Sequence, residues 1–514
     1  MRGAKPSLLF ALLVWSLLIL RFGYRYGTGD QVELLPYTVY LHDNTLYPHD
    51  FFIQGLNASV PNERTVMAHL TLPFVNHLEI FCFLMQLFST ILLVMGLQQL
   101  AFRFIHNKYL AWLAILIAMI PLNDFALGNV ELYSECFQAS GVAVAIIVWA
   151  INLFLDRKFI AASILMSVAT FIQLLEGLDV MIVLSLIMLL MLVIRQIPLK
   201  TFLTFGTIYF CSAGVYLIVI LMHKMGAVPG NMHAVDNAEL FNIVFLFRHP
   251  HHFIFASFPK FKMLVFFVLT LCALIFYSGR SSKIFDFVLI GLFGIIIYAF
   301  IVDGFHNVLI GNFQFYKVTI WMKFLGVVAA MGMAEEFIPA NWRLPDMVKY
   351  EKIGVVTIAV LSWVVIIYFN QYLPYNVPFQ LFGMKEKDDM IAICEKIKET
   401  TPADAIFVVP FDNTELKFYG QRSCFVEFKA NVKHKSFVGE WYRRIRIVFG
   451  ISAEDAQQGF ALKDRADANY YTSNLWQFNR KAGYGITHML VKKEYKPPYG
   501  SLILSNNTYA VYKL

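Results

Sequence analysis

Charged side chains are scarce in this chain. Only 15% of its 514 residues are Asp, Glu, Lys or Arg, 58% are hydrophobic, and the mean hydropathy is +0.60. Soluble domains carry about 25% charged residues. The composition therefore excludes an ordinary soluble globule and indicates a polytopic membrane protein.

Basic clusters are lacking as well. The formal net charge is +7, but the lysines and arginines are spread along short connections. Nucleic-acid binders gather such residues on one face. We therefore expect no nucleic-acid partner and interpret these residues as topology signals.

Cysteines are few, and their spacing shows no CxxC or other metal-binding pattern. Four of the six lie in or near apolar segments and are interpreted as packing residues: Cys82, Cys136, Cys211 and Cys272. Cys394 and Cys424 share the C-terminal part, so a disulfide between them is left open. Internal repeats and low-complexity segments are also absent.

Long apolar runs are what the chain has in abundance. Leu8–Phe22 follows a short basic start, and no small-residue cleavage site comes after it, so we expect a retained first span with a cytoplasmic N-terminus. Ten further spans are predicted at about 79–102, 109–122, 138–155, 159–175, 178–194, 201–222, 262–278, 284–302, 318–335 and 353–371. The expected fold is a mainly α-helical membrane protein with about eleven spans.

The connections between these spans alternate in character. One set is short and basic, as cytoplasmic loops are. The other set is longer, aromatic and richer in acids and histidines, and comprises 23–78, 123–137, 223–261, 303–317 and the chain after 372. With the N-terminus in the cytoplasm, an odd number of spans places the C-terminal part outside. We expect a multi-pass protein of the cell inner membrane.

The composition becomes that of a soluble domain near Gly383. Helical periodicity over 386–400, 437–449 and 466–482 alternates with apolar runs typical of strands at 405–409, 424–428, 489–491, 502–504 and 509–512. We expect a transmembrane domain at 1–382 and a small extracytoplasmic α/β domain at 383–514.

The stretch 26–52 on the first outer loop holds three aspartates. Asp30 directly follows the first span, where a carboxylate can act as a general base or help to hold a divalent cation. A glycine-rich turn explains it equally well. Asp43 and Asp50 are candidate supporting acids, and their neighbours fit turn or helix N-cap sequences better.

Three further acids border the predicted outer face. Asp124 and Glu131 lie on the second outer loop, and Asp124 is a candidate partner for Asp30 in any metal site. Glu176 lies between two apolar spans, where an acid usually faces the bundle interior or water. Alternatively, Asp124 and Glu131 lie at a solvated loop end, and Glu176 marks a tight helical corner at Gly177.

Arg248, His249, His251 and His252 form an unusual basic cluster on the long outer loop. Arginine and histidine bind phosphate oxygens through charge-assisted hydrogen bonds, and histidines can also ligate a transition metal. With no acid or cysteine nearby, phosphate or substrate contact is favoured over metal. Lys317 and Lys323, near the start of the tenth span, are further phosphate candidates.

With these parts assembled, the chain resembles the C-class membrane glycosyltransferases, which use polyprenyl-phosphate-linked sugars. More narrowly, it is similar to a group of bacterial membrane proteins related to that superfamily. The motifs concerned are GDQ…LYPHDFF (29–52), RHPHHF (248–253), TPADAIFVVPF (401–411), GQR (420–422) and EWYRRI (440–445).

The resemblance implies transfer of a sugar from a lipid-phosphate donor to an acceptor at the outer membrane face. The first-loop acid of the family maps onto Asp30, but Gln31 stands where the common pattern has a second acid. A transporter or flippase and a non-catalytic assembly protein are the alternatives. Transporters tend to show repeats and charges near the midplane, whereas here the acids lie at the rims.

Overall fold

The computed structural model describes residues 5–225, 235–337, 348–372, 388–455, 457–472 and 483–514. The predicted helices over 386–400 and 466–482 therefore lie partly outside the described residues. The chain divides into two compact units, each built from three stretches: 1–25, 82–217 and 251–381 in the first, and 26–81, 218–250 and 382–514 in the second.

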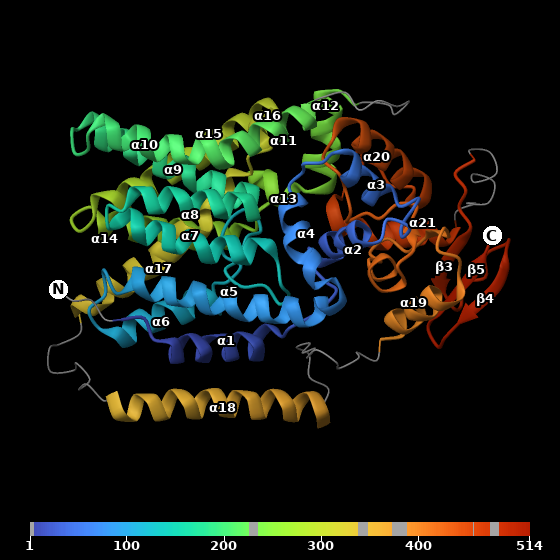
Figure 1. Cartoon of the computed structure of the whole chain (residues 1–514), viewed down its shortest axis with the longest axis horizontal. Helices are drawn as coiled ribbons and strands as arrows, with labels where there is room; N and C mark the ends of the chain where they lie inside the picture. The colour runs from blue at the N-terminus through green and yellow to red at the C-terminus, as the bar shows by residue number, and fades with distance from the viewer. Residues whose placement is uncertain (1–4, 226–234, 338–347, 373–387, 456, 473–482) are drawn as a thin grey trace. The chain divides into compact units, whose positions relative to one another are not determined.

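The first unit is a bundle of apolar helices that run side by side (Figure 1). Its longer elements are α1 (Leu8–Phe22), most of α5 (Leu78–Ala101), α6 (Lys108–Met119), α7 (Ala139–Leu155), α8 (Phe159–Ile172), α9 (Leu174–Val193), α10 (Leu199–Tyr209), α14 (Lys260–Tyr277), α15 (Ser282–Phe305), α17 (Thr319–Phe337) and α18 (Val348–Tyr372). Short elements complete it: the π-helical η2 (Phe210–Gly214), the first residues of α11 (Val215–Met225), most of α13 (Pro250–Phe253), η4 (Phe255–Ser257), α16 (Val308–Gly311) and η5 (Phe315–Val318).

Side chains at the helix starts fix several of these elements. Ser7 accepts the Phe10 amide at the start of α1, and Asn107 accepts the Tyr109 amide at 2.9 Å at the start of α6. In α18, the last helix of the bundle, the indole of Trp363 donates to Ser16 Oγ of α1 at 3.0 Å. Polar contacts thus supplement the packing of apolar side chains inside the bundle.

Among the described residues, six helical runs are long and apolar enough to cross a membrane: Thr65–Ala101, Leu174–Val193, Leu199–Met222, Lys260–Ser278, Ser282–Phe305 and Val308–Glu336. Five shorter apolar helices occupy the other predicted positions. These helices indicate an integral membrane protein, whereas the count of eleven spans and the orientation of the termini stay predictions.

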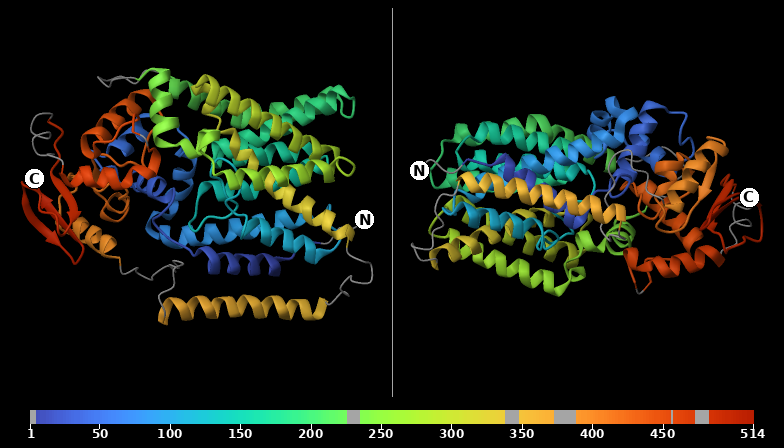
Figure 2. Two further views of the ribbon diagram at one scale, coloured as in Figure 1. Left: turned by 180° about the vertical axis from the view of Figure 1, so that it is seen from behind. Right: turned by 90° about the horizontal axis from the view of Figure 1, so that it is seen from below.

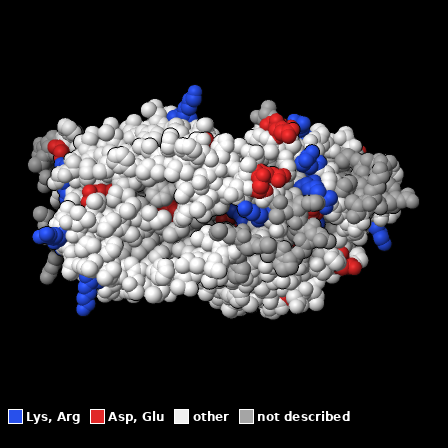
Figure 3. Space-filling view, turned by 90° about the horizontal axis from the view of Figure 1, so that it is seen from above, with Lys and Arg blue, Asp and Glu red and all other residues white. Residues whose placement is uncertain are grey.

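The outer face of α10 and α15 is typical of a lipid-facing surface. It exposes large apolar side chains, including Leu199, Leu203, Phe293, Ile296 and Ile297. Charged side chains are sparse over this long face of the bundle (Figure 3). Lipid tails can cover such a face without any unsatisfied polar group.

The second unit combines loop-derived helices with a small sheet. The first outer loop supplies α2 (Gln31–His42), α3 (Phe51–Ala58), α4 (Thr65–Thr71) and η1 (Leu72–His77), and the long loop supplies α12 (Asn237–Leu240) and the π-helical η3 (Phe241–Arg248). The C-terminal stretch supplies α19 (Asp389–Thr400), η7 (Leu416–Gly420), α20 (Lys435–Phe449), η8 (Gly459–Leu462) and α21 (Lys463–Thr472).

The sheet has the order β2-β1-β3-β5-β4. Its strands are β1 (Ile406–Val408), β2 (Ser423–Cys424), β3 (His488–Lys492), β4 (Ser501–Ser505) and β5 (Tyr509–Lys513). β1 runs parallel to β2 and β3, and β5 runs antiparallel to β3 and β4. The predicted small α/β domain is confirmed, although β2 is shorter than expected.

The core of this domain lies between α19 and the sheet (Figure 2). The apolar face of α19 packs against side chains of β1, β3 and β5, namely Phe407, Leu490 and Val511. Cys394 and Cys424 belong to the same core and are both free thiols, so no disulfide joins them.

Candidate functional site

The stretch from Tyr26 to Asp30 forms a turn that the C-terminal stretch holds in place. The phenol of Tyr419 donates to the carbonyl of Tyr26 at 2.9 Å. The ammonium of Lys429 donates to the carbonyl of Gly29 at 2.5 Å. The backbone directly before Asp30 is therefore fixed by two long-range hydrogen bonds.

Gly27 and Gln31 explain the local shape of this turn. Gly27 has φ +78°, and a Cβ there would lie 2.4 Å from the Tyr419 oxygen, so only glycine fits. Its amide donates to Oε1 of Gln31 at 2.8 Å. Gln31 thus closes the turn with its amide oxygen.

The three aspartates of the first loop are used in different ways. Asp43 is half-buried and accepts the amide and hydroxyl of Thr45 at 3.0 and 2.7 Å, which lowers the pKa of its carboxyl. Asp50 is buried and caps α3 by accepting the Ile53 amide at 2.9 Å. Asp30 stands at the N-cap position of α2, is exposed, and makes no capping hydrogen bond.

Arg248 is buried, with 2% of its surface exposed. Its Nε donates to the carbonyl of Phe428 at 2.7 Å and its Nη2 to the carbonyl of Lys429 at 2.9 Å. The guanidinium also lies over the rings of Phe428 and Phe460, at 4.7 and 4.8 Å. Burial lowers its pKa to about 9. A phosphate contact would have to displace these partners.

Lys429 connects Arg248 with the turn before Asp30. Its backbone carbonyl accepts from the guanidinium, while its side chain donates to the carbonyl of Gly29. Both predicted residues therefore belong to one hydrogen-bonded arrangement in the second unit. Within that arrangement Arg248 positions backbone and Asp30 presents the carboxylate.

The histidines of the predicted cluster are half-buried. The His249 amide donates to the carbonyl of Val244 at 3.1 Å. The rings of His251 and His252 lie 4.3 Å apart, and Nδ1 of His252 is 2.8 Å from the carbonyl of Gly128.

Lys317 and Glu176 form an ion pair inside the helix bundle. The ammonium lies 2.8 Å from Glu176 Oε1, and their side chains are 12% and 3% exposed. Asp179, one turn further along α9, is fully buried, and neither of its carboxylate oxygens has a hydrogen-bond partner among the described residues. Two predicted site residues thus meet, together with an acid outside the predicted set.

Lys323 closes the C-terminal end of α6. Its buried ammonium donates to the carbonyls of Leu122 and Asn123, just beyond the last residue of α6, at 2.6 and 2.7 Å. Asp124 and Glu131 are near enough to interact with it electrostatically. The ammonium of Lys323 is therefore held by backbone carbonyls.

The acids of the second outer loop lie at its surface. Asp124 is ion-paired with Lys262 at 2.5 Å. Glu131 is exposed; Asn123 Nδ2 lies 3.5 Å from its Oε2, and its carboxylate also forms a hydrogen bond with the side chain of Ser134. Exposed pairs of this kind contribute little to stability.

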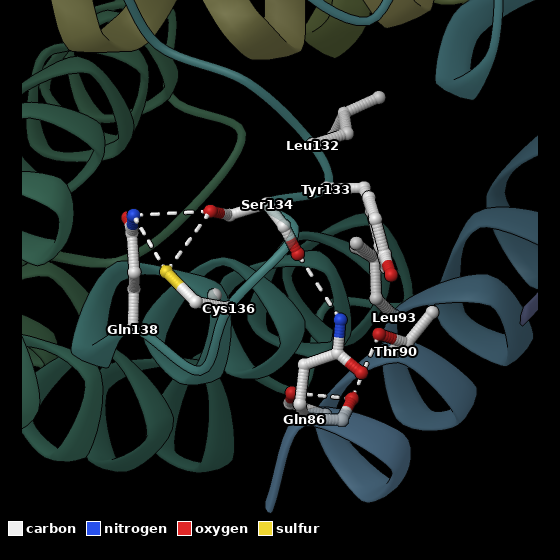
Figure 4. Close-up of a pocket in the computed structure, with 10 residues that line it drawn as sticks. Gln86, Thr90, Leu93, Leu132, Tyr133, Ser134, Cys136 and Gln138 are labelled. Carbon is white, nitrogen blue, oxygen red and sulfur yellow. Dashed lines mark hydrogen bonds between the residues drawn. The ribbon is translucent and has the colours of Figure 1, made fainter. Parts of the chain in front are cut away.

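A polar pocket opens in the helix bundle beside the same loop. Its lining includes Gln86, Ser89 and Thr90 of α5, Ser134 and Cys136 of the loop, and Gln138 at the start of α7 (Figure 4). The Gln86 amide donates to the carbonyl of Ser134 at 3.1 Å, and Gln138 Nε2 donates to Ser134 Oγ at 3.0 Å. The polar side chains that line the pocket are uncharged.

No predicted site residue lines this pocket. A signal for it exists in the sequence, because Gln86, Ser89 and Thr90 are spaced i, i+3, i+4 within an otherwise apolar helix and therefore share one face. Polar residues at helical spacing in a span mark a face turned away from lipid.

Comparisons with known proteins give limited matches. A family model described as a domain of unknown function (DUF6798) matches residues 388–448. No curated protein matches the chain. Among solved structures, the crystal structure of ArnT from Cupriavidus metallidurans bound to undecaprenyl phosphate is similar, with a TM-score of 0.44 and 11% identity over 98% of this chain and 96% of that one.

Proposed function

We propose that this integral membrane protein is glycosyltransferase-like and transfers a sugar from a polyprenyl-phosphate-linked donor to an acceptor at the outer membrane face. The observation that carries the proposal is the contrast among the first-loop aspartates. Asp43 and Asp50 use their carboxylates to stabilise a turn and a helix, whereas Asp30 presents its carboxylate from a backbone fixed by Tyr419 and Lys429.

In the proposed reaction Asp30 acts as a general base. Its carboxylate takes the proton of an acceptor hydroxyl or amine as that group attacks the anomeric carbon of the donor sugar. The bond between this carbon and the phosphate oxygen breaks, and the electron pair leaves with the polyprenyl phosphate. A fixed backbone favours this role because a base must be held at hydrogen-bonding distance from the proton it removes.

We assign no metal to Asp30. A divalent cation needs several oxygen ligands, but the amide oxygen of Gln31 accepts from Gly27 and the carboxylate of Asp124 is paired with Lys262. For the donor phosphate we propose the half-buried His249, which belongs to the same unit as Asp30. The guanidinium of Arg248 and the ammonium groups of Lys317 and Lys323 are engaged by protein groups.

The experiment compares Asp30→Asn with Asp43→Asn in a host that lacks the gene. Envelope glycans and the lipid-linked sugar pool are measured by mass spectrometry at matched protein levels. Asp30→Asn should reduce transfer by about 100-fold or more, the usual contribution of a general base, and should let the donor accumulate. Asp43→Asn, a change at a half-buried position of the same loop, should behave as the unaltered protein. A normal glycan profile for Asp30→Asn would refute the catalytic proposal.

A specific observation also favours a second candidate, a non-catalytic assembly protein with the same architecture. Four of the predicted site residues, Asp50, Arg248, Lys317 and Lys323, are engaged in interactions that stabilise the fold. In this case deletion of the gene would change the envelope, while both aspartate variants would restore it fully.

A further inference from the structure

A second group of chemically active side chains lies apart from Asp30, in the interior of the second unit. Asp50 stands at the start of α3, Cys424 ends β2, and Glu427 follows on the next loop. All three are buried, at 1%, 2% and 4% exposure. One oxygen or sulfur atom from each lies within 4.8 Å of the others.

Backbone donors hold the carboxylate of Asp50 in position. Its Oδ1 accepts the Ile53 amide and its Oδ2 accepts the Cys424 amide, both at 2.9 Å. Each carboxylate oxygen has a second lone pair for a further partner. Metal-ligating carboxylates are commonly oriented by hydrogen bonds of this type.

Glu427 is held from two sides and has one oxygen to spare. Its Oε2 is ion-paired with the buried Lys417, and its backbone carbonyl accepts from the indole of Trp441 at 3.0 Å. Its Oε1 is buried and has no hydrogen-bond partner among the described residues. A buried charged oxygen without a partner is costly, so this atom points to a ligand.

The charges of the group lead to the same conclusion. With Asp50 and Glu427 ionised and Lys417 protonated, the group carries a net charge of −1 in a dry interior. A divalent cation that binds the Cys424 sulfur as a thiolate adds +2 and −1, which brings the sum to zero. A water molecule in place of the cation would leave the charge of −1 buried.

We propose that Asp50, Cys424 and Glu427 bind one divalent transition-metal ion, with Zn²⁺ as the natural occupant. A thiolate ligand selects zinc over magnesium or calcium, and zinc accepts mixed sulfur and oxygen ligands in four-coordinate sites. A water molecule would complete the coordination. Lys417, paired with Glu427 Oε2, leaves Oε1 for the metal.

The consequence would be structural. The ligands come from the first outer loop and from the C-terminal stretch, which are far apart in sequence, with 374 residues between Asp50 and Cys424. A metal bond between them would stabilise the second unit in the same way as a cross-link. The alternative is that a proton on Glu427 removes the charge and no metal binds.

The experiment uses the full chain purified in detergent. Metal content is measured by mass spectrometry, and Co²⁺ is exchanged into the protein to detect thiolate-to-cobalt charge-transfer absorption. We expect about one zinc per chain and a charge-transfer band. Cys424→Ser and Glu427→Gln should each reduce the zinc content at least about tenfold, the scale on which ligand changes act.

Cys394→Ser is the matched control, because Cys394 is a second buried thiol of the same domain and lies outside the group. It should retain both the zinc and the cobalt band. The unaltered protein tests the proposal even if a variant fails to fold. The proposal would be overturned if the cobalt-loaded protein lacked the charge-transfer band, or if the zinc content of the unaltered protein were no higher than that of Cys424→Ser. The outcome is independent of any transferase activity.

Discussion

The guanidinium of Arg248 donates from Nε to the carbonyl of Phe428 at 2.7 Å, across 180 residues of sequence. The same group lies over the Phe428 ring at 4.7 Å. The long outer loop and the C-terminal stretch are thereby joined in one unit. A planar guanidinium can stack and donate at the same time, which an ammonium cannot do.

Arg248→Lys should therefore destabilise the second unit by about 2 kcal/mol, since it removes a charge-assisted hydrogen bond and two ring contacts. Hydrogen exchange of the amides at 425–430, with thermal unfolding of the full chain, measures the loss. Arg446→Lys, at an exposed position of α20, is the control and should have little effect. If Arg248→Lys keeps full stability but loses transfer activity, the phosphate-binding role would be favoured instead.

The sequence predicted the elements better than the site. Apolar runs identified the helices of the bundle, and turn chemistry correctly indicated that Asp43 and Asp50 are turn and cap residues. Local patterns carry this information because spans and caps depend on neighbours within a few residues.

Local sequence patterns could not predict which groups the basic residues contact. The partner of Lys317 is 141 residues away, and the carbonyl acceptors of Lys323 about 200. Composition showed that these cations are unusual in a span, but it could not distinguish a phosphate ligand from an internal partner, because both satisfy the same charge. Only the packing of η5 against α9 and of α17 against α6 resolves that choice.

Gly177 permits the close approach of α9 to α8. A Cβ there would lie 2.5 Å from the backbone nitrogen of Thr170 and 2.2 Å from its hydroxyl. Gly177→Ala should cost about 1–3 kcal/mol, because backbone cannot move aside as a flexible side chain can. Gly141→Ala in α7 is the matched control, since a Cβ there meets nothing within 4 Å and alanine favours a helix. Equal melting temperatures in detergent would contradict the packing argument.

His488 makes the stability of the C-terminal domain depend on pH. It stacks on Phe407 at 4.7 Å, and burial, with the charges of Lys513 and Arg422, lowers its pKa to about 4. The unfolded chain takes up this proton near pH 6.5. Stability should therefore be complete above about pH 6.5 and fall as the pH decreases towards 4, by at most about 3 kcal/mol.

The measurement for His488 is thermal unfolding of the full chain in detergent between about pH 7.5 and pH 4.5. His488→Gln should remove this component, so that the difference in stability between the two proteins changes with pH only inside that window. A difference that stays constant across the range would show that His488 does not titrate on unfolding.

In the group of Glu176, Asp179 and Lys317, loss of the positive charge should destabilise the protein more than loss of one negative charge. Lys317 pairs with Glu176 at 2.8 Å and also interacts electrostatically with Asp179, which is fully buried. With both acids ionised, Glu176→Gln leaves one negative and one positive charge, whereas Lys317→Met leaves two negative charges in the bundle interior. Removal of one partner of a buried pair is costly mainly through the charge that remains.

We therefore expect Lys317→Met to lower stability by about 3 kcal/mol or more and Glu176→Gln by about 1 kcal/mol, since the glutamine oxygen can still accept from the lysine. Thermal unfolding in detergent compares the two, and adding Asp179→Asn to Lys317→Met should recover part of the loss. Equal losses for the two single variants, without recovery in the double variant, would mean that Asp179 carries no charge in the folded protein. The size of the recovery thus measures how much of the cost of losing Lys317 comes from Asp179.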